Sequence, residues 1–250
     1  MKNIKEVNEK SFAAEAYRSV RANLSFCDID DNIKTILFTS TKQNEGKTTI
    51  VSNVAYSFSK LEKSKVLLID LDLRNPSVHK AFEINNKQGI INFLREETPI
   101  EKCVHEIDES MHILTTGGIL DNPTELLSSK KMKNFLQDIK SQYDYIFVDS
   151  PSAGVVSDAV VISSLVDGVV YVVGMKDTDL SFAQETVENL RKCNANIIGC
   201  ILNKFDAKQS NYGYYYSGYY YGEEEKEHKH KSNIDKKFTV GKKVKLQQQK

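Results

Sequence analysis

Short apolar segments alternate with helix-forming segments along most of this chain, and this alternation restricts the folds open to it. Continuous apolar strands of five or six residues are typical of a parallel sheet that is covered on both faces. We therefore predict an α/β fold with a doubly wound, mostly parallel sheet over residues 31–206. The strands are predicted at 35–40, 65–70, 111–115, 145–149, 168–173 and 196–202, and the helices at 47–60, 123–140, 158–165 and 180–193.

Two flanking segments differ from this single domain in composition. Residues 1–30 are polar and rich in helix formers, so we predict a helical lead, with its strongest helical character over 13–24. Residues 207–250 contain a tyrosine-rich stretch followed by a Lys-rich stretch and have too few apolar residues for a core. Such a composition predicts a flexible tail.

Composition and charge exclude several classes of protein. Lys plus Arg and Asp plus Glu are both 34, and this zero net charge argues against a nucleic-acid partner. No apolar run reaches membrane-spanning length, and the first residues lack the apolar segment of a signal peptide. The four cysteines contain no CxxC pair, which argues against zinc or iron–sulfur ligation and favours a reducing compartment.

Residues 40–49 (STKQNEGKTT) lie between a predicted strand and a predicted helix, the context of a phosphate-binding loop. Backbone N–H groups of such a loop bind phosphate oxygens, the lysine reaches the β- and γ-phosphates, and the following hydroxyl binds Mg²⁺. Ser40 and Asn44 replace the usual glycines, but asparagine tolerates a positive φ. A chance GKT at a helix start is the alternative. The predicted nucleotide contacts are Ser40, Lys42, Asn44, Glu45, Gly46, Lys47, Thr48 and Thr49.

Lys42 and Asn203 each allow two interpretations. Lys42 is either an additional phosphate-contacting lysine or an exposed loop residue. Asn203 begins an NKFD sequence after the last predicted strand, and it either contacts the nucleotide base or forms a polar turn. Because NKFD resembles the NKxD of GTPases, the sequence does not firmly exclude guanine.

Three carboxylates follow buried strands. Asp70 is the last residue of the strand 65–70, and Asp72 lies two residues after it. Asp149 is the last residue of the strand 145–149. Carboxylates in such places are costly unless they meet a cation, and Mg²⁺ on nucleotide phosphates supplies one. We predict Thr48, Asp70 and Asp149 as metal-binding residues, with a solvated acidic loop as the alternative for Asp70 and Asp72.

On these motifs the chain resembles the bacterial tyrosine kinases of capsule and exopolysaccharide operons, of the separate cytoplasmic type. This family lies in the MinD/ParA-like branch of P-loop proteins. The resemblance rests on Walker A (40–49), Walker A′ (67–74) with its RNPS continuation (74–77), Walker B (146–149), the segment 122–128, an ExxRxxR at Glu15, Arg18 and Arg21, and the tyrosine cluster of Tyr212, Tyr214, Tyr215, Tyr216, Tyr219, Tyr220 and Tyr221. The chain departs from the family at residues 43–44, at Ser152 where a second proline is common, and in its long Lys-rich tail.

The resemblance implies an ATP- and Mg²⁺-dependent kinase that phosphorylates its own tyrosine cluster between subunits. In this interpretation Lys47 neutralises the γ-phosphate, Asp70 accepts or orients the tyrosine proton, and Asp72 supports the metal.

The resemblance also implies partners and a location. It implies a ring-like homo-oligomer with Glu15, Arg18 and Arg21 in the interface, a membrane-embedded activator protein and a cognate tyrosine phosphatase. The kinase would be cytoplasmic, recruited to the inner face of the plasma membrane, and would regulate polysaccharide polymerisation and export.

Two other functions share these motifs. A MinD/ParA-type positioning ATPase has the same nucleotide motifs, and it requires a DNA-binding surface or an amphipathic membrane helix. The apolar residues of 234–246 make only a poor helical stripe. An iron–sulfur carrier of the same branch requires the cysteine pair that this sequence lacks.

Overall fold

The computed structural model describes residues 11–31, 33–175 and 177–205. By its internal contacts the chain divides into a unit that ends at Lys204 and a second unit from Phe205 onward. The fold below is that of the first unit. The tyrosine cluster and the tail predicted over 207–250 lie outside the described residues.

Within the described residues, seven strands form one sheet in the order β3-β4-β2-β5-β1-β6-β7. Every neighbouring pair is parallel except β3 with β4, which is antiparallel at the sheet edge. The doubly wound, mostly parallel α/β fold predicted from the sequence is therefore confirmed. The strands are β1 (Thr35–Ser40), β2 (Val66–Asp70), β3 (Val104–Glu106), β4 (Met111–Leu114), β5 (Tyr145–Asp149), β6 (Gly168–Gly174) and β7 (Ile197–Asn203).

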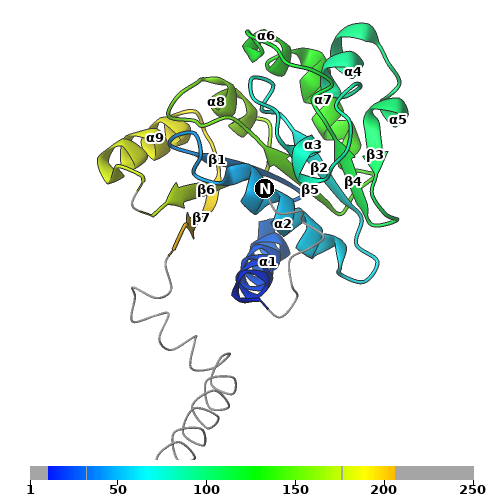
Figure 1. Ribbon diagram of the computed structural model, residues 1–250. Coiled ribbons are helices and arrows are strands. Elements are labelled where there is room, and N and C mark those ends of the chain that lie inside the picture. The colour runs from blue at the N-terminus through cyan, green and yellow to red at the C-terminus, as the bar shows by residue number, and fades with distance from the viewer. Residues whose placement is uncertain (1–10, 32, 176, 206–250) are drawn as a thin grey trace, which may run out of the picture. The chain divides into compact units, whose positions relative to one another are not determined.

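The helices cover both faces of this sheet (Figure 1). Helices α1, α2 and α3 contribute to one apolar cluster, and α4 to α9 contribute to the other. No helix in the described ranges is long and apolar enough to cross a membrane. The helices are α1 (Phe12–Asp31), α2 (Lys47–Ser59), α3 (Val78–Ala81), α4 (Ile90–Glu96), α5 (Ile100–Cys103), α6 (Thr124–Leu127), α7 (Lys130–Ile139), α8 (Asp158–Ser163) and α9 (Leu180–Lys192).

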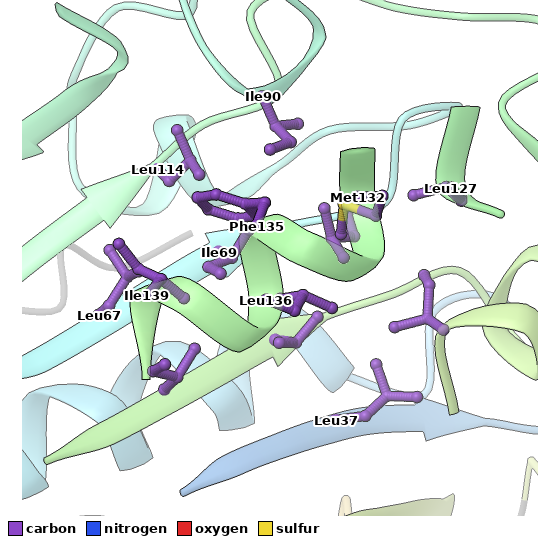
Figure 2. Packing of buried hydrophobic residues seen from close by; sticks show 14 of the residues in the cluster. Leu37, Leu67, Ile69, Ile90, Leu114, Leu127, Met132, Phe135, Leu136 and Ile139 are labelled. Atoms are coloured by element: carbon purple, nitrogen blue, oxygen red, sulfur yellow. The ribbon is translucent and has the colours of Figure 1, made fainter. Parts of the chain in front are cut away.

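The continuous apolar strands divide their side chains between the two cores because successive residues point to opposite faces. In β2, Leu67 and Ile69 pack on the side of α7, whereas Val66 and Leu68 pack with α2. Figure 2 shows the apolar face of α7 against the first pair. Burial of each such side chain contributes about 1.5–3 kcal/mol.

The structure differs from the sequence-based prediction in two regions. The helix predicted at 123–140 is two helices, because the Ser129 side chain accepts a hydrogen bond from Met132 N at 3.1 Å and begins α7 anew. The short elements α3, α4, α5 and β3 were not predicted, since three to seven residues are too few to show a period.

Candidate nucleotide-binding and active site

The phosphate loop joins β1 to α2 through a turn with two left-handed residues. Asn44 has φ of 64° and Gly46 has φ of 93°. Gly46 is also the N-cap residue of α2 and leaves the first backbone N–H groups of that helix without a side-chain cap. Such N–H groups at a helix N-terminus form an anion-binding site.

A cavity of about 480 Å³ opens at this end of α2. Its size suits a small-molecule ligand. It brings together several of the predicted nucleotide contacts and one of the predicted catalytic carboxylates. The lining residues are Gln43, Asn44, Gly46, Lys47, Thr48, Thr49, Asp72, Asn75 and Ser77. Sequence reasoning did not assign Gln43, Asn75 or Ser77, although each lies inside a motif that it had identified.

The Lys47 ammonium is held beside the cavity by a residue that sequence reasoning did not assign. Its Nζ donates a hydrogen bond to Ser152 Oγ at 3.0 Å, and Ser152 is only 2% exposed. The Ser40 hydroxyl lies 3.3 Å from the same oxygen. Ser152 occupies the position noted above as a departure from the family, and that departure was the available signal.

Thr48, which lines the cavity, makes a hydrogen bond to the buried Asp149. Thr48 Oγ1 donates to Asp149 Oδ2 at 2.6 Å and accepts from Ser77 Oγ at 3.0 Å. The other carboxylate oxygen, Asp149 Oδ1, is buried and has no hydrogen-bond partner among the described residues. Burial raises the pKa of Asp149 to about 7, although the bond from Thr48 and the charge of Lys47 oppose this rise. An orphaned buried carboxylate oxygen next to a hydroxyl fits a Mg²⁺ site.

The two carboxylates after β2 differ in their surroundings. Asp70 is fully buried, and it accepts hydrogen bonds from the backbone N–H groups of Asp72, Ser77 and Val78 at 3.0–3.1 Å. Burial and the charge of Asp149 raise the pKa of Asp70 well above its usual range. Asp72 lines the cavity instead, and burial raises its pKa against the effects of the Asn75 N–H and Lys47. Of the two, only Asp72 reaches the cavity.

An ion pair ties the loop after β2 to two other segments. Arg74 donates to both oxygens of the buried Asp158, with Nε at 2.5 Å, and to the carbonyl of Asp121 at 2.6 Å. Thr124 Oγ1 donates to the same Asp158 at 2.6 Å. The Walker A′ loop is thereby fixed to the segment 122–128 and to α8. Sequence reasoning did not single out Asp158.

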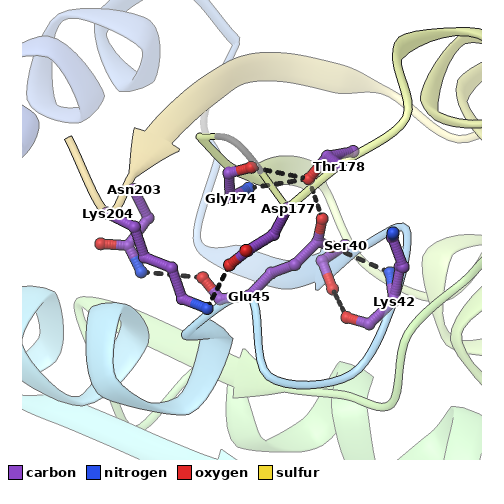
Figure 3. Close-up of polar contacts among 8 residues, drawn as sticks. All are labelled: Ser40, Lys42, Glu45, Gly174, Asp177, Thr178, Asn203 and Lys204. Atoms are coloured by element: carbon purple, nitrogen blue, oxygen red, sulfur yellow. Dashed lines mark hydrogen bonds and ion pairs between the residues drawn. The ribbon is translucent and has the colours of Figure 1, made fainter.

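Four of the predicted nucleotide contacts do not line the cavity, and Figure 3 shows them: Ser40, Lys42, Glu45 and Asn203. Asn203 Nδ2 donates to the carbonyl oxygen of Glu45 at 2.8 Å. The hydrogen bond and charge of Lys204 lower the pKa of Asp177, and the charge of Lys42 adds to this effect. Lys42 therefore lies near the segment after β6, and its contact with phosphate, like the base contact of Asn203, stays a prediction.

The three charged residues predicted for an oligomer interface make contacts within the chain. Arg18 Nε donates to Glu15 Oε2 at 2.7 Å along α1. Arg21 donates to the Ser57 carbonyl at 2.6 Å, near the end of α2. The interface itself stays a prediction.

Comparisons with known proteins show which family the chain resembles. The AAA domain family matches residues 33–203. The tyrosine-protein kinase YwqD of Bacillus subtilis is 38% identical over 208 residues, which cover 82% of this chain and 87% of that protein. The kinase domain of the Escherichia coli tyrosine kinase ETK superposes with a TM-score of 0.76 at 28% identity, covering 81% of each chain.

A more distant structural relative marks the wider branch. MinD in the MinC:MinD complex of Aquifex aeolicus has a TM-score of 0.58 at 27% identity, covering 70% of each chain. The sequence identity to YwqD extends over most of both chains, and the fold with its phosphate loop is shared with the kinase domain of ETK. Together these similarities show the family. The chain belongs to the bacterial tyrosine-kinase family, in the MinD/ParA-like branch of P-loop proteins.

Proposed function

We propose that this protein transfers the γ-phosphoryl group of ATP to tyrosines of its own C-terminal cluster, between subunits. The acceptors are Tyr212, Tyr214, Tyr215, Tyr216, Tyr219, Tyr220 and Tyr221. The observation that carries the proposal is the Thr48–Asp149 pair, with its unpartnered carboxylate oxygen, beneath a cavity that Lys47 also lines. Phosphoryl transfer depends chiefly on such positioning and charge neutralisation.

Thr48 and Asp149 would hold Mg²⁺, which neutralises phosphate charge when it is bound. Asp70 is placed next to Asp149 in the register of β2 and β5 and supports this site. Lys47 carries the positive charge on the protein side of the cavity and faces the β- and γ-phosphates.

In this proposal the carboxylate that meets the acceptor tyrosine is Asp72, and not Asp70 as the resemblance implied. A phenol has a pKa of about 10 and is a weak nucleophile until a base takes its proton. Asp72 lines the cavity, whereas the oxygens of Asp70 already accept three backbone hydrogen bonds. The tyrosine proton passes to Asp72 as the phenol oxygen bonds to phosphorus and the bond to the ADP oxygen breaks.

The biological setting is part of the same proposal. We propose a cytoplasmic, ring-like oligomer that a membrane-embedded activator recruits to the inner face of the plasma membrane and switches on. A cognate phosphatase would reset it, and the cycle would regulate capsular or exopolysaccharide polymerisation and export. The relatives that are named tyrosine-protein kinases support the kinase activity on which this setting depends.

A phosphotyrosine blot tests the proposal directly. Wild-type protein is incubated with ATP and Mg²⁺, alone and with candidate membrane activators, beside Lys47→Met and a variant with all seven cluster tyrosines changed to Phe. We expect phosphotyrosine only in the wild type. A near-normal signal from Lys47→Met would contradict the role of that lysine.

The alternative is a MinD/ParA-type positioning ATPase, which the likeness to MinD supports at the level of the fold. The same experiment separates the two functions. ATP hydrolysis without phosphotyrosine, with every candidate activator present, would favour the positioning ATPase.

A further inference from the structure

The phosphate loop of this chain keeps Gly46 but has Ser40 and Asn44 at two positions where such loops commonly have glycine. Asn44 adopts a left-handed φ of 64° in the loop, a conformation that asparagine tolerates better than most residues but less readily than glycine. Contacts from neighbouring segments add to the stability of this turn.

Glu45 supplies those contacts from the side of the loop that faces away from the cavity. Its side chain is buried and is not among the cavity-lining residues. Lys42 N donates to Glu45 Oε2 at 2.9 Å, and Thr178 Oγ1 donates to Glu45 Oε1. Figure 3 shows the Glu45 carboxylate between these two partners. Both carboxylate oxygens are therefore used within the protein.

Thr178, which donates to the Glu45 carboxylate, is itself held by a hydrogen bond from the backbone. Gly174 N donates to Thr178 Oγ1 at 3.0 Å, at the end of β6. A Cβ on Gly174 would lie 3.3 Å from Glu45 Cγ, so the stem of Glu45 packs closely on this backbone. On the neighbouring strand, Asn203 bonds to the Glu45 carbonyl. The segment after β6 therefore binds the carboxylate of Glu45, and the end of β7 binds its backbone carbonyl.

We infer that Glu45 and Thr178 are positioning residues for nucleotide binding, which hold the phosphate loop in its phosphate-accepting shape from behind. This inference rests on the proposed function, since it requires that the loop bind a nucleotide. Thr178 does not line the cavity, so its effect on affinity passes through Glu45. A buried carboxylate that loses a hydrogen-bond donor is costly, which couples the hydroxyl to the loop.

The test compares Thr178→Val, which removes the hydroxyl at nearly constant volume, with Thr178→Ser, which keeps it. The matched control is Thr115→Val, because Thr115 is buried and donates to the Gln88 carbonyl outside the cavity. The dissociation constant for a fluorescent ADP analogue with Mg²⁺ is measured by anisotropy, and the unfolding temperature is measured without nucleotide.

We expect Thr178→Val to weaken binding about 10- to 100-fold, the range for a lost hydrogen bond to a charged group. Thr178→Ser should bind nearly as the wild type does. Thr115→Val should lower the unfolding temperature without changing affinity. In a Glu45→Ala background, Thr178→Val should cause little further loss of nucleotide affinity, because the two residues act as one unit.

Three results would overturn the inference. The first is unchanged affinity in Thr178→Val, even with a lower unfolding temperature. The second is an equal loss of affinity in Thr115→Val, and the third is full additivity with Glu45→Ala. If Glu45→Ala does not fold, the comparison of Thr178→Val with Thr178→Ser still tests the inference. Failure of the wild type to bind any nucleotide would overturn the proposed function and this inference together.

Discussion

Asp70 and Asp149 are register partners on the adjacent strands β2 and β5, and both are fully buried. Burial raises the pKa of both carboxyl groups, and the charge of Asp149 raises the pKa of Asp70 further. The site is therefore held in a costly state that a bound cation would relieve.

The first prediction follows from this repulsion. Asp149→Asn removes one of the two charges while keeping the shape of the side chain. We expect a higher unfolding temperature than the wild type in Mg²⁺-free buffer, together with loss of tyrosine phosphorylation. Calorimetry with and without Mg²⁺ measures the unfolding temperature, and a phosphotyrosine blot measures the phosphorylation. An Asn variant that is less stable than the wild type without Mg²⁺ would contradict the argument.

The second prediction concerns the hydroxyl beside the phosphate-loop lysine. Ser152→Ala removes the acceptor that holds Lys47 Nζ. Since a hydrogen bond to a charged group contributes about 1.5–3 kcal/mol, we expect ATP affinity to fall about tenfold or more. Ser152→Thr, which keeps the hydroxyl, is the matched control. Titration of both variants with a fluorescent nucleotide checks this, and equal affinities would show that the contact has no role in binding.

The third prediction concerns the ion pair behind the Walker A′ loop. Asp158→Asn leaves Arg74 with a neutral partner and weakens the tie to Thr124. Removing one charge of a fully buried pair costs about 3–5 kcal/mol. Because the Arg74 side chain is 30% exposed, the free energy of unfolding should fall by less than that amount. Urea denaturation measures it. Asp138→Asn, on the outer face of α7, should change it by less than about 0.5 kcal/mol.

The fourth prediction is a pH dependence at the opposite end of the sheet. Burial would raise the pKa of Asp167, but hydrogen bonds from Lys140 and Thr35 outweigh it and lower the pKa. The stability from this carboxylate is therefore present above its unfolded pKa of about 3.9 and is lost as pH falls through the lower folded value. Asp167→Asn should destabilise the protein by about 1–3 kcal/mol at neutral pH.

The measurement for Asp167 is urea denaturation of wild type and variant from neutral to acidic pH. The difference between them should be constant above about pH 5 and shrink below about pH 4. A difference that grew on acidification would have the wrong sign for a lowered pKa.

The fifth prediction separates assembly from folding on α1. Arg21 bonds to the Ser57 carbonyl of its own chain, whereas Glu15 and Arg18 pair with each other along the helix. We expect the double variant Glu15→Ala/Arg18→Ala to keep its unfolding temperature and to lose the oligomer. Light scattering gives the mass. An unchanged mass would rule these two residues out of the interface.

Most strands of the sheet and the order of the motifs could be predicted from local patterns in the sequence. Continuous apolar runs such as 66–70 and 145–149 are typical of buried parallel strands, and a GKT between a strand and a helix is typical of a phosphate loop. These are local patterns, with a period or a spacing that can be counted along the chain. The family resemblance rested on the same spacing.

The contacts between polar groups from distant parts of the chain could not be predicted from the sequence. Ser152 lies 105 residues from the Lys47 that it holds, and Asp158 lies 84 residues from Arg74. No period marks such pairs, because strand order, not sequence distance, brings the carboxyl ends of β1, β2 and β5 together. The different surroundings of Asp70 and Asp72 could not be predicted either, since both residues lie at the end of the same strand. Backbone N–H groups of residues 77 and 78 turn one carboxylate inward and leave the other facing the cavity.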